Sequence, residues 1–199
     1  MKPTVALVVI SDRPHELYLN RCLASLDQFL DHPISQRIIV DDPGHNYTAS
    51  RAVRVGWEGV ENAEYVLHWE EDMLATAPVD VEGMAAVLDA EQDLAQLCLL
   101  RQPWSHPEHQ AGGIIQLYAE HMHDRETLGH PWIQHDRFFS LNPCLVPRRV
   151  YELGFPEGSE PAMTQLLLEA GFSFGYWGAR TEGPKVLHIG ELRAPGSVR

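Results

Sequence analysis

Basic residues and long hydrophobic runs are both scarce in this sequence. The chain has 15 lysine and arginine residues against 28 aspartate and glutamate residues, and its formal net charge at pH 7 is −13. Such a surface repels phosphate backbones and anionic headgroups, which disfavours non-specific binding to nucleic acid or to a membrane surface. The apolar runs, such as residues 5–10, are far too short to cross a bilayer, so we expect no membrane span.

Cysteine is also rare. Cys22, Cys98 and Cys144 are odd in number, widely spaced and surrounded by apolar residues. They predict reduced, buried thiols in a cytoplasmic protein, in place of a disulfide framework or a zinc site. The histidines of residues 106–135 are spaced too irregularly for a zinc pattern. No apolar segment follows the charged start as in a signal peptide, which agrees with a cytoplasmic location.

Apolar strand patterns and helical patterns alternate along the first half of the chain. Strands are expected at residues 5–10, 37–40, 65–69 and 94–100, and helices at 19–30, 46–58 and 81–90. This alternation predicts a mainly parallel sheet with helices on both faces. The second half is expected to contain an irregular region at 102–136, helices at 147–153 and 162–170, and strands at 172–177 and 186–189. Since no repeat or linker interrupts the chain, we expect a single domain.

Polar residues follow each of the first three expected strands. The carboxyl ends of parallel strands meet at one edge of a sheet, which is where open α/β sheets bind ligands. Hard divalent cations prefer oxygen ligands, so an acidic triplet there predicts a metal that holds a phosphorylated substrate. The alternative is a solvated acidic turn. The three clusters are Ser11-Asp12-Arg13, Asp41-Asp42 and Glu70-Glu71-Asp72.

These clusters are part of a longer series of motifs. The series contains an opening strand and polar loop at residues 8–14, a helix pattern at 19–26, a second strand with acids at 38–44, the acidic triplet, and later segments at 158–161 and 187–190. Their order resembles the nucleotide-sugar-dependent glycosyltransferases of the GT-A fold, in particular family two and its inverting relatives. The resemblance implies a GT-A-type, Rossmann-like, mainly parallel central sheet flanked by helices. It implies a single domain over residues 1–199, with a nucleotide-sugar-binding half at 1–100 and an acceptor and catalytic half at 101–199.

The resemblance also implies a role for individual residues. Asp72, with His188 from the late segment, would bind a divalent cation, Mn²⁺ or Mg²⁺. Glu160 would be the catalytic base that takes the proton of the acceptor hydroxyl. Contacts with the nucleotide sugar are implied for Ser11, Asp12, Arg13, Asp41, Asp42, Arg51 and Glu71.

Two departures from the family pattern leave alternatives open. The metal motif is Glu-Glu-Asp where the family has Asp-x-Asp, so Glu70 or Glu71 can share the metal with Asp72. The base motif is Glu-Pro where the family has Glu-Asp, and Glu157 lies close enough in sequence to compete with Glu160. Structural roles are also open, since an acid at a helix N-terminus can act through its charge alone and a histidine in an apolar segment can belong to the core.

The expected function is a metal-dependent, inverting transfer of a sugar from a nucleoside diphosphate sugar, UDP-linked, to a hydroxyl acceptor, in a hexosyltransferase-like reaction. The acceptor stays open among a glycan, a protein, a small molecule and a modified nucleic acid base. The main alternative is a non-catalytic nucleotide- or sugar-binding module of the same fold. A nucleotidyltransferase is disfavoured, because no glycine-rich, lysine-containing phosphate loop follows the first strand.

Overall fold

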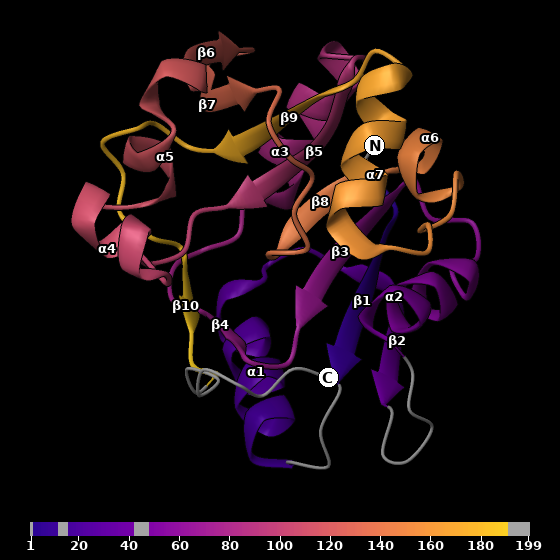
Figure 1. Cartoon of the computed structure of the whole chain (residues 1–199). Coiled ribbons are helices and arrows are strands. Elements are labelled where there is room, and N and C mark those ends of the chain that lie inside the picture. Colours follow the sequence, from indigo (N-terminus) through magenta and orange to yellow (C-terminus); the bar gives the residue numbers. More distant parts are fainter. Residues whose placement is uncertain (1, 12–15, 42–47, 191–199) are drawn as a thin grey trace.

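The chain folds around one large mixed sheet with helices on both faces (Figure 1). The computed structural model describes residues 2–11, 16–41 and 48–190. Its main sheet has eight strands in the order β2-β1-β3-β8-β5-β9-β7-β6, and a second sheet pairs β10 with β4. The strands are β1 (Val5–Ser11), β2 (Ile34–Asp41), β3 (Tyr65–Glu70), β4 (Met73–Ala75), β5 (Leu94–Leu99), β6 (His123–Thr127), β7 (His130–His135), β8 (Cys144–Pro147), β9 (Ser173–Trp177) and β10 (Val186–His188).

Helices cover the sheet because its central strands are apolar on both faces. Alternate residues of β1 enter different clusters, with Val8 in one and Leu7 in the other. The first cluster packs under α2, α6 and α7, and the second packs under α1 and α3. The helices are α1 (Glu16–Phe29), α2 (Ala49–Glu58), α3 (Val81–Ala90), α4 (His106–Ala111), α5 (Ile114–Leu117), α6 (Arg148–Tyr151) and α7 (Ser159–Glu169), with a 3₁₀ turn at Ala119–His121.

The structure confirms the predicted fold class, an α/β domain with a central sheet between helices. Strands β1, β2 and β3 are parallel, as are β5 and β9. Helix α3 has the predicted bounds, and Asp80 caps it by accepting a hydrogen bond from the Gly83 amide at 2.9 Å. Among the helices that the structure describes, none is long and apolar enough to span a bilayer. The three cysteines are free and buried, as predicted.

The prediction of an irregular region at residues 102–136 was wrong. That region contains α4, α5 and the hairpin of β6 and β7, which joins the main sheet through antiparallel pairing of β7 with β9. Strand β6 is polar and almost wholly exposed, so it carries no hydrophobic alternation. The hairpin turn has Leu128 and Gly129 at φ 54° and 82°, a left-handed pair typical of two-residue turns.

Strand β8 was not predicted, and it is central to the sheet. It lies between β3 and β5 and is antiparallel to both. Its four residues, Cys144–Pro147, are too few to reveal a periodic pattern, and they end in proline. Because β8 runs against its neighbours, its first residue Cys144 lies opposite His68, close to the carboxyl end of β3. The loop that precedes β8 therefore reaches the same edge as the acidic triplet.

His68 is an uncompensated polar group in the middle of this sheet. Its side chain is fully buried, and neither ring nitrogen has a hydrogen-bond partner among the residues that the structure describes. Its ring meets the indole of Trp57 edge-on, with 6.4 Å between ring centroids. Burial disfavours the charged imidazolium and lowers the pKa of His68 to about 3. Burial likewise lowers the pKa of His135, on β7, to about 4.

We expect acid to destabilise the fold through His68. Its unfolded-state pKa is about 6.5, so between that pH and about 3 the unfolded chain holds a proton that the folded chain does not. The contribution is fully present above about pH 6.5, and each pH unit below it costs up to about 1.4 kcal/mol. Urea unfolding at pH 7.5, 5.5 and 4.5 measures this slope. His68→Leu should flatten it and the exposed control His123→Gln should not; equal slopes for wild type and His68→Leu would contradict the assignment.

Candidate functional site

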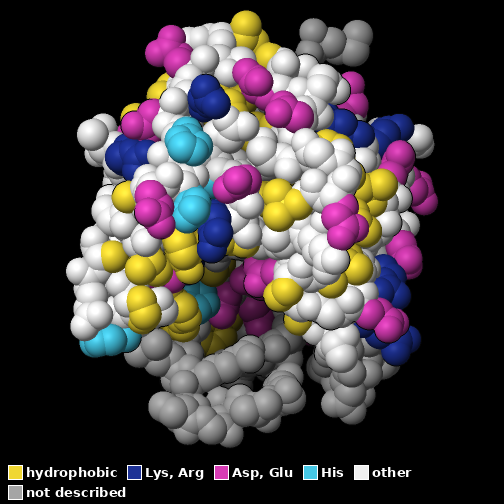
Figure 2. All heavy atoms as spheres, turned by 45° about the horizontal axis from the view of Figure 1, so that its top comes forward, with side chains coloured by type: hydrophobic (Ala, Val, Ile, Leu, Met, Phe, Trp, Pro, Cys, Tyr) yellow, Lys and Arg dark blue, Asp and Glu magenta, His cyan; other side chains and the backbone are white. Residues whose placement is uncertain are grey.

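The ends of β1, β2 and β3 bring the predicted polar clusters to one edge of the sheet. Ser11 pairs in register with Asp41, and Ile10 pairs with Glu70. These three carboxyl ends point the same way, toward the bottom of Figure 1. Figure 2 shows acidic side chains gathered in a hollow of the surface, beside histidine. The convergence that was inferred from strand order is therefore present for the residues that the structure describes.

Glu71 is a buried carboxylate that packs against the end of β1. Its side chain is 5% exposed, and Ser11 Oγ donates a hydrogen bond to Glu71 Oε2 at 2.7 Å. The Glu71 amide donates to the carbonyl of Ile10 at 3.0 Å, so the chain stays joined to β1 just beyond the end of β3. Ser11 and Glu71, both predicted to contact the nucleotide, are thus hydrogen-bonded to each other. Together they hold the turn that carries Asp72.

Asp72 and His188 meet across 116 residues of sequence. Asp72 Oδ2 and His188 Nε2 are 3.0 Å apart, and the side chains are 30% and 13% exposed, respectively. The contact follows from the small sheet, in which His188 on β10 pairs with Met73 on β4, directly after the triplet. The Ile189 amide donates to the Asp72 carbonyl at 2.8 Å. A Cβ at Gly190 would lie 2.4 Å from Asp72 Oδ2, so a side chain there would displace the carboxylate.

The segment between β5 and α4 holds His188 in place. The Gln102 amide group donates to the His188 carbonyl at 2.8 Å and accepts from the His188 amide at 2.9 Å. The ring of Trp104 meets the imidazole edge-on, with centroids 3.7 Å apart. No role was assigned to Gln102 from the sequence. A glutamine far from β10 carries no local signal for such a role.

Glu108, on α4, holds the segment between β5 and α4 in place. It is 5% exposed, accepts hydrogen bonds from Arg101 at 2.7 and 3.1 Å, and accepts another from the Trp104 amide at 2.9 Å. Burial alone would raise the pKa of Glu108, but the hydrogen bonds from Arg101 and the Trp104 amide outweigh it and lower that pKa. A charged Glu108, paired with Arg101, therefore fixes the loop that carries Trp104, whose ring packs on His188.

The pair of Asp72 and His188 fits a divalent cation whose remaining coordination positions are filled by water and substrate. Asp72 Oδ2 and His188 Nε2 lie at hydrogen-bonding distance, 3.0 Å, so a carboxylate oxygen and an imidazole nitrogen, two groups that bind divalent cations, already face each other. In the part of the chain that the structure describes, no group of three or more His, Cys, Asp or Glu side chains is placed to hold a metal. Protein sites for Mg²⁺ commonly use one or two carboxylates and leave the other positions to water and substrate phosphates.

The field around this edge is negative, as a cation site requires. Burial, and then the charges of Glu71 and Asp72, raise the pKa of the Cys22 thiol on α1 to about 12. Burial and the neighbouring Cys98 raise the pKa of Cys144 well above its usual value, and the charges of Glu160 and Glu70 add to that rise. Cys144 therefore lies close enough to the triplet and to the start of α7 for the charges of Glu70 and Glu160 to raise its pKa.

Glu160 lies in the first turn of α7, where it contacts the loop before β8. Its Oε1 accepts a hydrogen bond from the Leu141 amide at 2.6 Å. Glycine at 158 and serine at 159 both have positive φ, 100° and 67°, so a sharp backbone turn delivers Glu160. Glu157, the alternative base, has a side chain that is 92% exposed. Exposure to bulk water makes Glu157 the weaker choice for a base that must work in a site closed to solvent.

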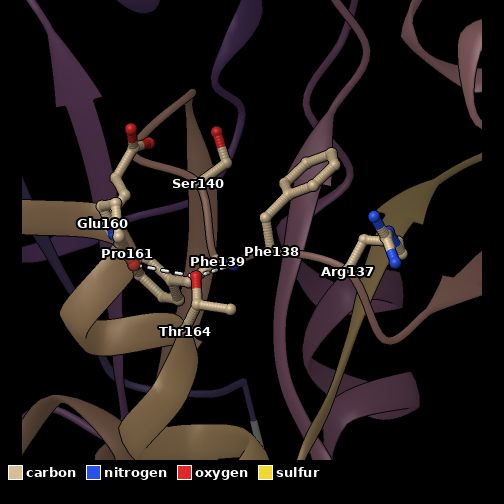
Figure 3. A pocket seen from close by; sticks show the side chains of 7 residues that line it. All are labelled: Arg137, Phe138, Phe139, Ser140, Glu160, Pro161 and Thr164. Carbon is tan, nitrogen blue, oxygen red and sulfur yellow. Dashed lines mark hydrogen bonds between the residues drawn. The ribbon is translucent and has the colours of Figure 1, made fainter.

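A cavity of about 400 Å³ opens beside Glu160 (Figure 3). Its volume falls in the range of small-molecule sites. In Figure 3 the carboxylate of Glu160 and the hydroxyl of Ser140 point to the same side, and the ring of Phe138 stands between them and Arg137. The cavity is lined by Arg137, Phe138, Phe139, Ser140, Glu160, Pro161 and Thr164.

The remaining predicted residues are dispersed or lie beyond the described ranges. Asp41 is exposed at the end of β2. Arg51 lies in the first turn of α2, where its amide donates to Thr48 Oγ1 at 3.3 Å and its side chain is exposed. The predictions for Asp12, Arg13 and Asp42 fall outside the residues that the structure describes.

Comparison with the models of known protein families found no match, and neither did comparison with curated protein sequences. The site is therefore interpreted from its own chemistry. That chemistry is a carboxylate and imidazole pair at the edge of an α/β sheet, and a second carboxylate beside a cavity at the same edge.

Proposed function

We propose that this protein is a GT-A-type glycosyltransferase that moves a sugar from a nucleoside diphosphate sugar, UDP-linked, to a hydroxyl acceptor with inversion. The observation that carries this proposal is the pairing of Asp72 with His188 at the carboxyl edge of the sheet, 3.0 Å apart in a negative field. The placement of Glu160 beside a cavity at the same edge supports it. We place the reaction in the cytoplasm, the location that the reduced thiols suggested.

Asp72 and His188 would bind Mn²⁺ or Mg²⁺ together with the diphosphate of the donor. A divalent cation in this position neutralises negative charge that develops on a diphosphate leaving group. Gln102 and Trp104 orient His188, whose Nε2 faces Asp72. A ligand pair that is held rigidly before the substrate arrives loses little entropy on binding.

Glu160 would take the proton of the acceptor hydroxyl as that oxygen attacks the sugar. The Leu141 amide engages Oε1 at 2.6 Å, and within the described chain no hydrogen bond engages Oε2. One oxygen is therefore held while the other can receive a proton. General base catalysis of this kind contributes roughly 10²- to 10⁴-fold to a rate.

The donor nucleotide would lie along the ends of β1 and β2. In our proposal Ser11, Asp41, Arg51 and Glu71 contribute to this subsite, together with Asp12, Arg13 and Asp42. The hydrogen bond from Ser11 to Glu71 keeps the end of β1 and the start of the triplet in a fixed relation. Such a link would set the distance between the nucleotide subsite and the metal pair.

The test is donor hydrolysis by the purified protein, with water in place of the acceptor. We expect release of UDP from at least one UDP-sugar in the presence of Mn²⁺, and a loss of roughly 100-fold or more with EDTA that added Mn²⁺ reverses, since a cation stabilises the leaving group by several kcal/mol. GDP-, ADP- and TDP-sugars serve as matched donors. UDP binding by calorimetry without sugar release would instead support a non-catalytic binding module. The absence of both UDP binding and sugar release would contradict the enzyme and the binding module alike.

A further inference from the structure

Hydrogen bonds join the two segments that line the cavity beside Glu160. Thr164 Oγ1 accepts a hydrogen bond from the Phe139 amide at 2.8 Å and donates one to the Glu160 carbonyl at 2.8 Å. The loop that forms one wall is thereby tied to α7, which forms the other. A site that exists before its ligand arrives avoids the entropic cost of ordering side chains.

The ring of Phe138 lines the cavity between Glu160 and Arg137 (Figure 3). Phe138 packs against Tyr118, with 5.6 Å between ring centroids, and against His135 at 4.8 Å. His135 is itself buried and stacked on Tyr176 at 5.3 Å. Held on two sides, the ring of Phe138 is only partly buried, which leaves part of its surface for the flat body of a ligand.

Arg137 supplies a positive charge at the far end of the cavity from Glu160. Its guanidinium forms no ion pair or hydrogen bond within the described chain, even with the adjacent Asp136. In a protein of net charge −13, an unpaired arginine on a cavity wall is a distinct feature. Guanidinium groups bind carboxylates and phosphates through paired hydrogen bonds.

We propose that the acceptor is an anionic hydroxyl compound: its hydroxyl lies at Glu160, its body packs on Phe138, and its carboxylate or phosphate binds Arg137. This inference rests on the proposed function for the role of Glu160, but the binding of an anion in the cavity does not. The two ends of the cavity carry opposite charge, so they set the direction in which such a molecule enters. A neutral acceptor would leave Arg137 without a partner.

Binding is measured first, without any donor, by NMR or tryptophan fluorescence with three matched probes. These are para-(hydroxymethyl)benzoate, para-(hydroxymethyl)phenyl phosphate and the neutral para-(hydroxymethyl)benzamide. We expect the anionic probes to bind roughly tenfold more tightly than the amide, the low end for hydrogen bonds to charged groups because Arg137 is exposed. The tighter of the two anions identifies carboxylate or phosphate as the recognised group.

Arg137→Gln should abolish the preference for the anionic probes, while Arg125→Gln, which removes the same charge on exposed β6, should preserve it. With a UDP-sugar that the wild type hydrolyses, transfer to the anionic probe should show a KM roughly tenfold lower than transfer to the amide. Equal binding of all three probes, or a preference that survives Arg137→Gln, would overturn the inference. Anion binding without hydrolysis of any UDP-sugar would overturn the proposed function alone.

Discussion

Replacing Asp72 with asparagine is expected to lower Mn²⁺-dependent hydrolysis of a UDP-sugar by roughly 100-fold or more. The substitution keeps the shape of the side chain but removes its negative charge, next to the oxygen that lies 3.0 Å from His188 Nε2 and that we propose as a metal ligand. Loss of a metal ligand in this position removes several kcal/mol of charge stabilisation, and about 2.7 kcal/mol already corresponds to 100-fold. His188→Gln should have a smaller effect, roughly tenfold, because the carboxylate remains.

The measurement is a Mn²⁺ titration of initial rates at fixed UDP-sugar. Asp72→Asn should raise the Mn²⁺ concentration needed for half-maximal rate, whereas Asp93→Asn should behave as wild type, because Asp93 is exposed at the start of β5, at the other edge of the sheet. Glu70→Gln tests the remaining ambiguity in the triplet. Undiminished turnover by Asp72→Asn would rule out Asp72 as the ligand, and a loss confined to Glu70→Gln would transfer that role to Glu70.

Replacing Glu160 with glutamine is expected to lower kcat by roughly 10²- to 10⁴-fold with little change in the KM of the donor. Glutamine can still accept the hydrogen bond from the Leu141 amide through its Oε1, so the loop before β8 should keep its position. What the variant loses is the second carboxylate oxygen, which would otherwise accept the proton of the acceptor or of water. A loss in kcat with unchanged donor binding distinguishes a base from a residue that only shapes the site.

Two further variants make this result specific. Glu169→Gln, at the other end of α7, should keep wild-type activity, since Glu169 lies on the helix surface and, within the described ranges, its side chain hydrogen-bonds with Gln165 alone. Formate added to Glu160→Ala should restore part of the rate by replacing the missing carboxylate. If Glu157→Gln shows the large loss and Glu160→Gln does not, Glu157 is the base and Glu160 serves the start of the helix.

Local sequence patterns determined the first half of this fold. Continuous apolar runs and helical spacing are properties of a few neighbouring residues, so β1, α1, β3, α3 and β5 were predicted close to their observed bounds. The alternation of these elements also predicted that Ser11, Asp41 and the triplet would meet at one edge, because the ends of parallel strands must do so. The location of the site was therefore inferred from the local patterns through the direction of the strands alone.

Residues 102–136 and β8 escaped prediction because their strands are stabilised by pairing with distant partners. The polar strand β6 exists through its hairpin with β7, and the four residues of β8 exist through pairing with β3 and β5 on either side. Hydrogen bonds to distant segments pair the backbone N–H and C=O groups of such strands, whatever the hydrophobic pattern of their side chains. Propensity within a short window carries no information on those partners.

The amino-acid sequence by itself determined the charge, the α/β class and the edge at which the acids gather. Only the tertiary structure decided which acid faces which partner. Three acids follow β3, and folding buries Glu71 against Ser11 while it turns Asp72 toward His188. It also places Glu160 beside a cavity with Arg137 at its far end. These relations depend on the pairing of β10 with β4 and on the reversed direction of β8, which are contacts between segments that no local pattern connects.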